Sequence, residues 1–250
     1  MSKNTEKRRK EILSMVNDRG TISVSDIAAR FPDLSEVTLR KDLKYLHENQ
    51  QLVCTHGGAK SIPSAFNYYF RSNFNLAEKK EVARKAADLI REMDSVFISA
   101  GTTCSELAKM IPEMPLHICS DGIYTISNIP NHPEISVEIL GGDLDMNAMR
   151  VEGLSALDKL DSMHFNICFI STLSIHPELG FSHYTAMTTA ILGKVIEHSD
   201  RVVVLADSKK FNSSFTQFRI PIECVNTVVT DSSTDESFIA SLRAKNIEVI

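Results

Sequence analysis

Apolar residues recur at a helical spacing within the first twenty residues. The apolar positions are Ile12, Leu13, Met15 and Val16. Charged residues fill the positions between them, so the pattern predicts an amphipathic helix that runs from Arg8 past Met15 and ends near Gly20.

Two shorter helices and a tight turn are predicted next. Ser23 and Asp26 form a pair like a capping box, so a second helix is expected to begin at Ser23. Pro32 ends that helix, and Ser35 is placed to cap a third helix over residues 35–49. We expect the apolar side chains of the third helix to face mainly inward: Val37, Leu39, Leu43 and Leu46. Helices joined in this way are typical of a helix-turn-helix.

The opposite face of the third helix is polar and basic. Its residues are Thr38, Arg40, Lys41 and Lys44. Basic side chains on the first turns of such a helix suit the major groove of DNA. Two short extended runs follow about a glycine turn, at residues 51–55 and 56–59, and this pattern is typical of a β wing beside a helix-turn-helix.

Charge is distributed unevenly along the chain. Residues 1–60 hold 11 Lys and Arg against 8 Asp and Glu, a net charge of +3, although the whole chain has a formal net charge of −5. A basic head on an acidic body is typical of a DNA-reading module on a separate domain. Charge and spacing alone leave open a solvated charged helix, a structural cap or a protein-binding module.

A specific motif joins the third helix to the wing. It reads Ser35-Glu36-Val37-Thr38-Leu39-Arg40-Lys41-Asp42-Leu43, then Leu46, then His56-Gly57-Gly58-Ala59. In this motif the chain resembles the DeoR family of bacterial transcription regulators. The resemblance implies DNA contacts by Ser35, Glu36, Thr38, Arg40, Lys41, Lys44, His56 and Gly57. The turn at residues 31–34 is one residue longer than usual, and Cys54 replaces a frequent Arg, so the operator sequence is not implied.

After the wing the pattern predicts a linker at residues 61–76 and an α/β domain at 77–250. An aromatic cluster falls at Phe66, Tyr68, Tyr69, Phe70 and Phe74, and we interpret it as packing rather than base stacking. An amphipathic helix begins at Ala77, and strands are expected at 95–99, 116–120, 135–140, 166–171, 201–206, 227–230 and 247–250. Helices are expected at 103–110, 153–160, 185–198 and 234–245. Nearly unbroken apolar strands indicate a parallel sheet covered on both faces, in a doubly wound α/β body.

Glycines and polar residues follow several predicted strands. They are Gly101, Thr102, Thr103, Ser120, Asp121, Gly141, Gly142, Asp207 and Lys210. The carboxyl ends of parallel strands meet along one edge, where backbone N–H groups, hydroxyls and a lysine suit a small phosphorylated ligand. Turn geometry alone is an alternative reason for such residues in these loops.

Further motifs extend the family resemblance through the body. They are Glu78-Lys79, Gly101-Thr102-Thr103, Gly141-Gly142, Gly153 and Asp207-x-x-Lys210-Phe211. The body resembles the DeoR sensor domain, which is similar in fold to ribose phosphate isomerases and usually senses phosphorylated sugars or related metabolites. This implies effector contacts by Lys79, Gly101, Thr102, Thr103, Asp207 and Lys210.

The body also departs from the family pattern. The usual T-N-S after the second strand reads Cys119-Ser120-Asp121, and Thr188 and Leu192 stand where a Glu and a Lys align. Asp121 is expected to repel phosphate unless it binds sugar hydroxyls or pairs with Lys79 or Lys210.

Composition excludes several classes of protein. With 43% hydrophobic and 24% charged residues, the chain is neither a disordered nor a membrane protein, and no apolar run approaches the roughly 20 residues of a membrane span. The N-terminus lacks the apolar core of a signal peptide, so a cytoplasmic location is expected. Five cysteines without a C-x-x-C pair predict reduced, mostly buried thiols, and neither zinc nor another cofactor is expected.

Three functions compete. The first is a DNA-binding regulator, by resemblance a repressor of a carbohydrate-metabolism operon, whose operator affinity a metabolite changes. The second is a sugar phosphate isomerase-like enzyme with Asp121 or Asp207 as general base, but no supporting constellation is present. The third is a protein-interaction adaptor, which leaves Arg40, Lys41 and Lys44 without a role. Since one head covers few base pairs, we expect a homodimer or homotetramer.

Overall fold

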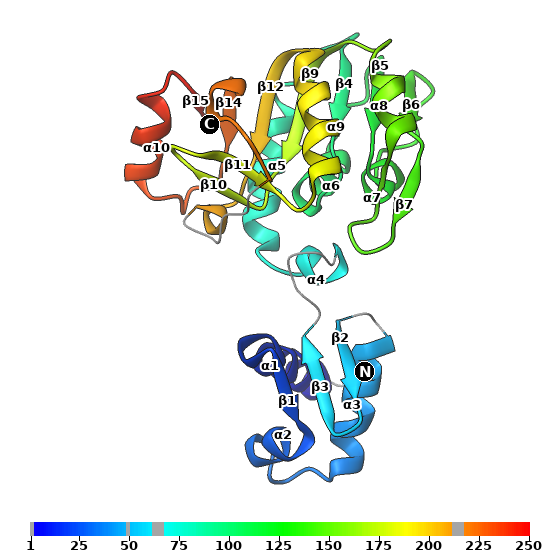
Figure 1. The fold of residues 1–250 in the computed structure, drawn as a ribbon, viewed down its shortest axis with the longest axis vertical. Coiled ribbons are helices and arrows are strands. Elements are labelled where there is room, and N and C mark those ends of the chain that lie inside the picture. The colour runs from blue at the N-terminus through cyan, green and yellow to red at the C-terminus, as the bar shows by residue number, and fades with distance from the viewer. Residues whose placement is uncertain (1–2, 49–50, 62–67, 212–217) are drawn as a thin grey trace. The chain divides into compact units, whose positions relative to one another are not determined.

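The computed structural model describes residues 3–48, 51–61, 68–211 and 218–250 (Figure 1). The chain divides into two compact units, Met1–Asn73 and Phe74–Ile250.

The N-terminal unit is a winged helix-turn-helix. Its elements are α1 (Lys3–Arg19), β1 (Thr21–Ser23), α2 (Val24–Arg30), α3 (Glu36–Glu48), β2 (Leu52–Thr55) and β3 (Gly58–Ser61), followed by the short α4 (Tyr68–Ser72). The capping box predicted at Ser23 and Asp26 is confirmed, since Ser23 accepts the Asp26 N–H and the Asp26 side chain accepts the Ser23 N–H. The wing is larger than expected, because β1 joins it in a three-stranded antiparallel sheet of order β1-β3-β2.

The core of this unit lies between the three helices and the sheet. It is built from Ile12, Val16, Ile22, Val24, Ile27, Leu39, Leu43, Leu46, Leu52 and Ala59. The expectation that Val37 faces inward is wrong, because its side chain is 63% exposed. Val37 lies two residues before Leu39, and roughly 200° of helical rotation places it on the outer face.

The C-terminal unit is built on a seven-stranded parallel sheet of order β15-β14-β12-β9-β4-β5-β6. The strands are β4 (Ser95–Ile98), β5 (Leu116–Ser120), β6 (Ile135–Ile139), β9 (Phe165–Ser171), β12 (Ser199–Leu205), β14 (Thr227–Val229) and β15 (Glu248–Val249). All seven predicted strands are confirmed to within two residues at their ends. The expected parallel α/β class is therefore confirmed.

Helices cover both faces of this sheet, as Figure 1 shows with α9 in front of the strands and α5 behind them. One face packs on α5 (Leu76–Ala87) and α6 (Thr102–Ala108), in a core that includes Val82 and Leu107. The other face packs on α8 (Leu154–Leu160), α9 (Ala186–Glu197) and α10 (Glu236–Arg243), in a core that includes Leu192 and Leu242.

Several short elements lie outside the predicted pattern. They are α7 (Ile123–Ser127), the hairpin of β7 (Asp143–Asp145) and β8 (Arg150–Glu152), and a small sheet of β10 (Ser174–His176), β11 (Gly180–His183) and β13 (Phe218–Ile220). The segment 61–76, predicted as a linker, contains regular structure: Ser61 belongs to β3 and pairs with β2, and α4 lies at Tyr68–Ser72. Residues 62–67, including Phe66, lie outside the described residues.

The cysteines agree with the expectation of reduced, mostly buried thiols. All five are free, with Cys104, Cys119 and Cys168 buried, Cys54 half-buried and Cys224 exposed. None of the helices in the described ranges has the length and apolar character needed to cross a membrane.

Candidate functional site

The outer face of α3 presents the residues that the motif predicts as DNA contacts. Ser35 caps the helix, since the Thr38 N–H donates to Ser35 Oγ at 3.3 Å. Of the six predicted contacts at this helix, Thr38 is half-buried and five are exposed: Ser35, Glu36, Arg40, Lys41 and Lys44. Their ion pairs are long and lie on the surface, 3.6 Å for Arg40–Glu36 and 3.8 Å for Lys44–Glu48. Such pairs contribute roughly 0.3–0.5 kcal/mol, so the cations are available to phosphate groups.

Asp42 connects this helix to α1 from its buried side. Its carboxylate accepts Arg8 Nε at 2.6 Å and Arg9 Nε at 2.7 Å, and it is 2% exposed. The Arg9 guanidinium also lies 3.6 Å from the centre of the Tyr45 ring, in a cation–π contact. Asp42 was not among the residues predicted to have a role, although an acidic residue three positions after the buried Leu39 indicates a paired, inward carboxylate.

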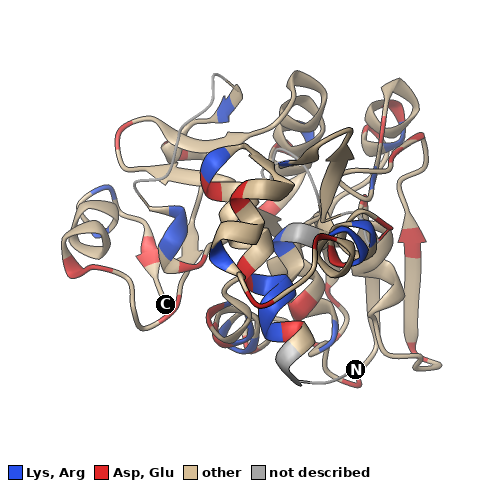
Figure 2. Cartoon of the chain, turned by 90° about the horizontal axis from the view of Figure 1, so that it is seen from below, with Lys and Arg blue, Asp and Glu red and all other residues tan. Residues whose placement is uncertain are grey.

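The wing turn has two glycines with different surroundings. His56 and Gly57 are exposed at the tip, whereas Gly58 is buried against β1. A Cβ on Gly58 would lie 2.0 Å from the Ile22 carbonyl oxygen, so only glycine allows β1 and β3 to approach this closely. Figure 2 shows Lys and Arg interleaved with Asp and Glu along the chain. Residues 1–60 hold 8 acidic residues among 11 basic ones, so the positive charge of this part of the sequence is not continuous.

In the C-terminal unit, the loop after β4 lies against the end of β9. Gly101 has φ +149°, and a Cβ there would lie 2.0 Å from Ser171 Oγ, so this position requires glycine. Ser171 Oγ donates to the Ala100 carbonyl at 2.8 Å. Thr102 and Thr103 follow at the start of α6 and are buried.

The polar side chains of the loop after β5 form hydrogen bonds with other groups of the protein. Ser120 Oγ donates to the Ile98 carbonyl and accepts the Gly122 N–H at 2.9 Å. Asp121 is fully buried, and its Oδ1 accepts the Ala100 N–H. Its Oδ2 accepts Arg150 Nε at 3.1 Å and Nη2 at 2.7 Å.

The counter-ion of Asp121 is therefore Arg150, and not Lys79 or Lys210, the two lysines that the sequence left open. The β7–β8 hairpin, which was not predicted from the sequence, brings Arg150 to Asp121 in the β5 loop and supplies the counter-charge. The hairpin is held there by the Val151 N–H, which donates to the Asp121 carbonyl at 2.7 Å. The negative charge of Asp121 is balanced inside the protein and does not oppose a nearby anion.

A network of polar groups extends from Arg150 to α9. Arg150 Nη1 donates to Thr188 Oγ1 at 3.0 Å, and Thr188 also contacts Thr185 and Glu152. Leu192, by contrast, belongs to the apolar core. His183 is buried close by, and burial together with the Arg150 charge lowers the pKa of His183 to about 3. Burial raises the pKa of Cys104, behind the β4 loop, to about 12.

Asp207 and Lys210 follow β12, and Asn75, immediately before α5 with its Lys79, contacts Asp207. Asp207 is fully buried, its Oδ1 accepts Asn75 Nδ2 at 3.1 Å, and its side chain caps the 3₁₀ turn Ser208–Lys210. Lys79 is 3% exposed, and its Nζ donates to the Phe74 carbonyl at 2.6 Å. Lys210 is half-buried. Strands β9 and β4 separate Asp207 from Asp121 within the sheet.

The two glycines after β6 shape the turn into β7. Gly141 and Gly142 have φ +75° and +124°, and a Cβ on Gly142 would lie 2.4 Å from the Glu152 carbonyl oxygen. The structure thus places them at the β6 side of the same edge, where they allow the hairpin to fold back.

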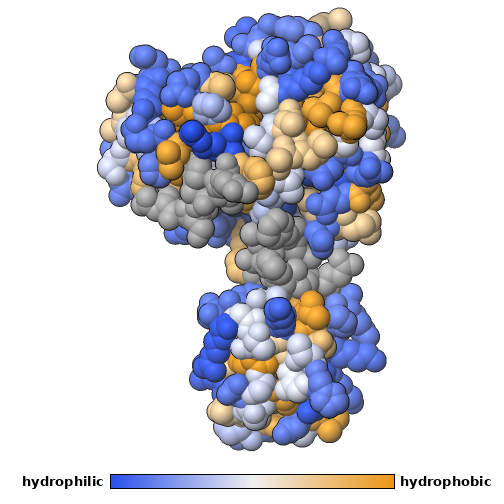
Figure 3. Space-filling view, in the orientation of Figure 1, coloured by the Kyte–Doolittle hydropathy of each residue, from blue (hydrophilic) through white to orange (hydrophobic). Residues whose placement is uncertain are grey.

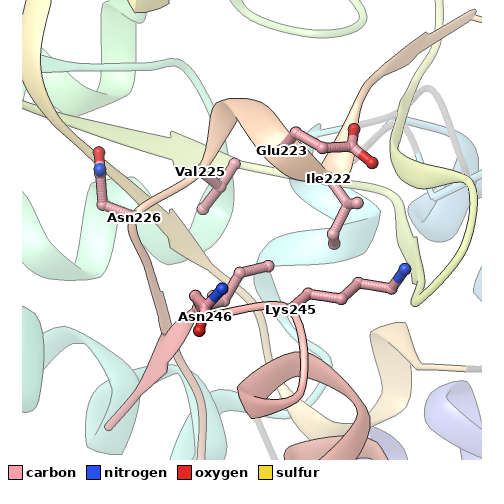
Figure 4. A pocket seen from close by; sticks show the side chains of 7 residues that line it. Ile222, Glu223, Val225, Asn226, Lys245 and Asn246 are labelled. Atoms are coloured by element: carbon pink, nitrogen blue, oxygen red, sulfur yellow. The ribbon is translucent and has the colours of Figure 1, made fainter.

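Two pockets lie away from these residues. One, of about 330 Å³, is lined by residues around the starts of β14 and β15, including Asn226 and Lys245 (Figure 4). The other, of about 340 Å³, is lined by His117, Glu138 and Lys159 among others. Within the described ranges, no group of three or more His, Cys, Asp or Glu side chains is arranged to hold a metal ion.

Comparison with protein families matches both units. Residues 8–65 match the DeoR-like helix-turn-helix domain, and residues 74–232 match the DeoR C-terminal sensor domain. The chain belongs to the DeoR family. It is a transcriptional regulator with a DNA-binding head and a small-molecule sensor domain, and the relatives below are named as regulators rather than enzymes.

Three relatives show how far the DeoR similarity extends. The chain is 29% identical over 245 residues to the uncharacterised HTH-type regulator YulB of Bacillus subtilis, covering 97% of this chain and 95% of that one. It is 28% identical to a putative aga operon transcriptional repressor of Escherichia coli O157:H7, covering 98% and 93%. It is 30% identical to the transcriptional repressor AccR of Agrobacterium fabrum, covering 92% and 91%. Among solved structures, ribose 5-phosphate isomerase A of Methanocaldococcus jannaschii matches 55% of each chain, with 15% identity and a TM-score of 0.39.

Proposed function

We propose that this DeoR-family regulator is a repressor of a carbohydrate-metabolism operon and that a phosphorylated sugar or related metabolite controls its operator affinity. The observation that carries the proposal is the concentration of buried polar and charged side chains at the carboxyl edge of the parallel sheet. These are Lys79, Thr102, Thr103, Asp121, Arg150, Thr188 and Asp207. Burial of so many polar groups costs stability, and ligand sites are where proteins retain them.

For DNA, we propose that Arg40, Lys41 and Lys44 bind phosphate groups or base edges from the outer face of α3. Ser35, Glu36 and Thr38 lie at the groove-entering end, with His56 and Gly57 of the wing against the backbone. Support comes from the exposure of the basic side chains and from the weakness of their ion pairs.

For the effector, we propose that Lys79 and Lys210 provide the positive charge for a phosphate and that Asp207 binds sugar hydroxyls. Thr102 and Thr103 add hydroxyl donors, while Gly101, Ser120, Gly141 and Gly142 shape the loops around the ligand. The Arg150 counter-charge supports an anionic ligand, because it balances the negative charge of Asp121, which would otherwise repel phosphate.

Names of relatives support the carbohydrate assignment. One E. coli relative is named for the aga operon, and a Streptococcus mutans relative with 29% identity is named the lactose phosphotransferase system repressor. We also propose a homodimer or homotetramer, since two heads are needed to bind spaced half-sites.

The effector half is tested by thermal unfolding with sugar phosphates, free sugars and inorganic phosphate. A ligand present at 100 times its Kd stabilises the fold by about 2.7 kcal/mol, so one phosphorylated compound is expected to raise the Tm. Lys210→Ala is expected to abolish the shift, and Lys209→Ala, at the neighbouring exposed position, is the matched control. No shift with any compound, or equal shifts in both variants, would refute the proposed effector site.

The DNA half is tested by fluorescence anisotropy on an operator fragment selected from genomic DNA by the wild-type protein. Arg40→Ala is expected to weaken binding by about 1–3 kcal/mol if Arg40 contacts a base, or to reduce the salt slope by about 1 if it contacts a phosphate. Arg243→Ala removes an exposed arginine of the sensor unit and serves as control. Unchanged affinity and salt slope in Arg40→Ala would refute the assignment of this face.

A further inference from the structure

The two edges of the seven-stranded sheet differ in how well they are protected. β15 has only two residues, and its Glu248 pairs with Arg201 at 2.6 Å. β6 has five residues, Ile135–Ile139, with no Lys or Pro among them, and its Val137 and Ile139 are 41% and 37% exposed. Native edge strands are normally protected by short length, Lys or Pro, because an open edge pairs with another strand. β6 is therefore an edge open to pairing.

The backbone of β6 has a defined open side. The Leu116 N–H donates to the Glu134 carbonyl, and the Leu140 N–H donates to the Ser120 carbonyl, so the even-numbered residues of β6 face β5. Because successive residues of a strand direct their backbone groups to opposite sides, the odd-numbered residues Ile135, Val137 and Ile139 face outward.

Two of these outward groups already have partners. The Ile135 N–H donates to the His132 carbonyl at 3.1 Å, and the Ile139 carbonyl accepts Lys159 Nζ at 2.9 Å. The outward groups without a partner among the described residues are both groups of Val137, the Ile139 N–H and the Ile135 carbonyl.

This set of groups is complementary to itself under a two-fold rotation. In an antiparallel pair centred on Val137, the Val137 N–H of each copy meets the Val137 carbonyl of the other. The Ile139 N–H of each copy then meets the Ile135 carbonyl of the other. All open groups are satisfied, and the two groups that have partners already lie at the ends of the ladder.

The side chains agree with the same register. Ile135 then lies opposite Ile139 of the partner subunit, and Val137 opposite its own copy, so apolar side chains meet on one face. Glu138 lies opposite Ser136 rather than a like charge, and it is already paired with Lys159 at 2.7 Å. Exposed apolar side chains continue onto the adjoining hairpin and helix start, at Leu144, Met146 and Leu154. Hydrophobic surface also reaches the side of the sheet unit where β6 and β7 lie (Figure 3).

We propose that the β6 edge binds a second copy of this chain through an antiparallel β6–β6 pair centred on Val137, which extends the two sheets into one. The proposal deepens the proposed function, which requires an oligomer to place two DNA-binding heads. Its test uses neither DNA nor effector, so a failure of this interface is distinguishable from a failure of operator binding or of effector binding.

The test is the mass of the full chain by sedimentation velocity. Val137→Lys places two charges opposite each other at the centre of the pair and is expected to weaken association more than tenfold, without removing a hydrogen bond to β5. Leu179→Lys, at a position that is 42% exposed elsewhere on this unit, is the control and is expected to associate like the wild type. A monomeric wild type, which would leave the edge to an unrelated partner, or a folded Val137→Lys variant with the wild-type mass, would overturn the proposal.

A second variant keeps the test valid if Val137→Lys does not fold. Opposed residues of an antiparallel hydrogen-bonded pair have Cα atoms about 5.5 Å apart, within the range that a disulfide spans. Val137→Cys is expected to form a covalent dimer on mild oxidation, at a level well above the wild type with its exposed Cys224. Cross-linking no greater than that of the wild type and of Leu179→Cys would overturn the proposed register.

Discussion

Arg150 donates two hydrogen bonds to a single carboxylate oxygen of Asp121, from Nε at 3.1 Å and from Nη2 at 2.7 Å. Asp121 is fully buried and Arg150 is 6% exposed. The pair connects the end of β5 to the β7–β8 hairpin, and through Thr188 it reaches α9. The sensor unit therefore has a rigid polar junction beside the proposed effector site.

Removing one partner of this junction is expected to be costly. Asp121→Ala leaves the Arg150 charge buried without its counter-ion, and the free energy of unfolding is expected to fall by about 3–5 kcal/mol in urea titrations. The double variant Asp121→Leu/Arg150→Met should lose less than the sum of the single variants, because no charge then remains unpaired. Glu236→Ala, which breaks an exposed pair with Arg243, is the control. A loss below about 0.5 kcal/mol in Asp121→Ala would contradict this account.

The two adjacent glycines of the wing should respond differently to substitution. In Gly58→Ala the new methyl group would lie 2.0 Å from the Ile22 carbonyl oxygen and 2.8 Å from Ser23 Cα, both backbone atoms of β1. We expect a loss of about 1–3 kcal/mol and faster amide exchange in β3. Gly57→Ala meets no atom within 4 Å and should leave both quantities unchanged. Equal effects of the two substitutions would show that the β1 contact is not the reason for Gly58.

Stability is expected to fall in mild acid because of His183. Burial and the Arg150 charge hold the folded pKa of His183 at about 3, below its ordinary value of 6.5. Between these values the unfolded chain binds the proton more readily, so stability falls as the pH drops from 6.5 toward 3, by up to about 1.4 kcal/mol per pH unit. His183→Gln should flatten this slope, whereas His164→Gln, at an exposed position, should not. Identical slopes in both variants would exclude His183 as the cause.

Asp42 is expected to hold the DNA-binding head together rather than to contact DNA. Asp42→Ala removes the shared partner of Arg8 and Arg9, and we expect a loss of about 1–3 kcal/mol together with faster hydrogen exchange in α1 and α3. Asp33→Ala, in the exposed turn before α3, is the matched control. Unchanged exchange in α1 after Asp42→Ala would mean that the two ion pairs do not join the helices.

The long apolar runs made the sheet predictable, whereas the short polar strands did not. Residues 201–206 are apolar in five of six positions, and the shortness of the run separates it from a helix. β7, β8, β10 and β13 have three residues each and mix polar with apolar side chains, so no periodicity identifies them. Their positions depend on tertiary contacts.

The candidate site, like the fold, was predictable from the sequence only in part. Loops after strands were predictable, because the carboxyl ends of parallel strands share one edge. Arg150 was missed, since its approach to Asp121 requires the β7–β8 hairpin. The prediction that Val37 faces inward was wrong because the buried face of α3 begins at Leu39. The presence of an apolar residue near the start of a helix does not show whether its side chain lies on the buried face.

The most direct test of the account is the effect of the effector on DNA affinity. Fluorescence anisotropy would measure the Kd for the selected operator fragment with and without the phosphorylated compound that raises the Tm, at a saturating concentration. The account predicts a change of roughly 5–150-fold, equivalent to a coupling of about 1–3 kcal/mol, that is lost in Lys210→Ala and kept in Lys209→Ala. An operator Kd that is the same with and without bound effector would contradict it.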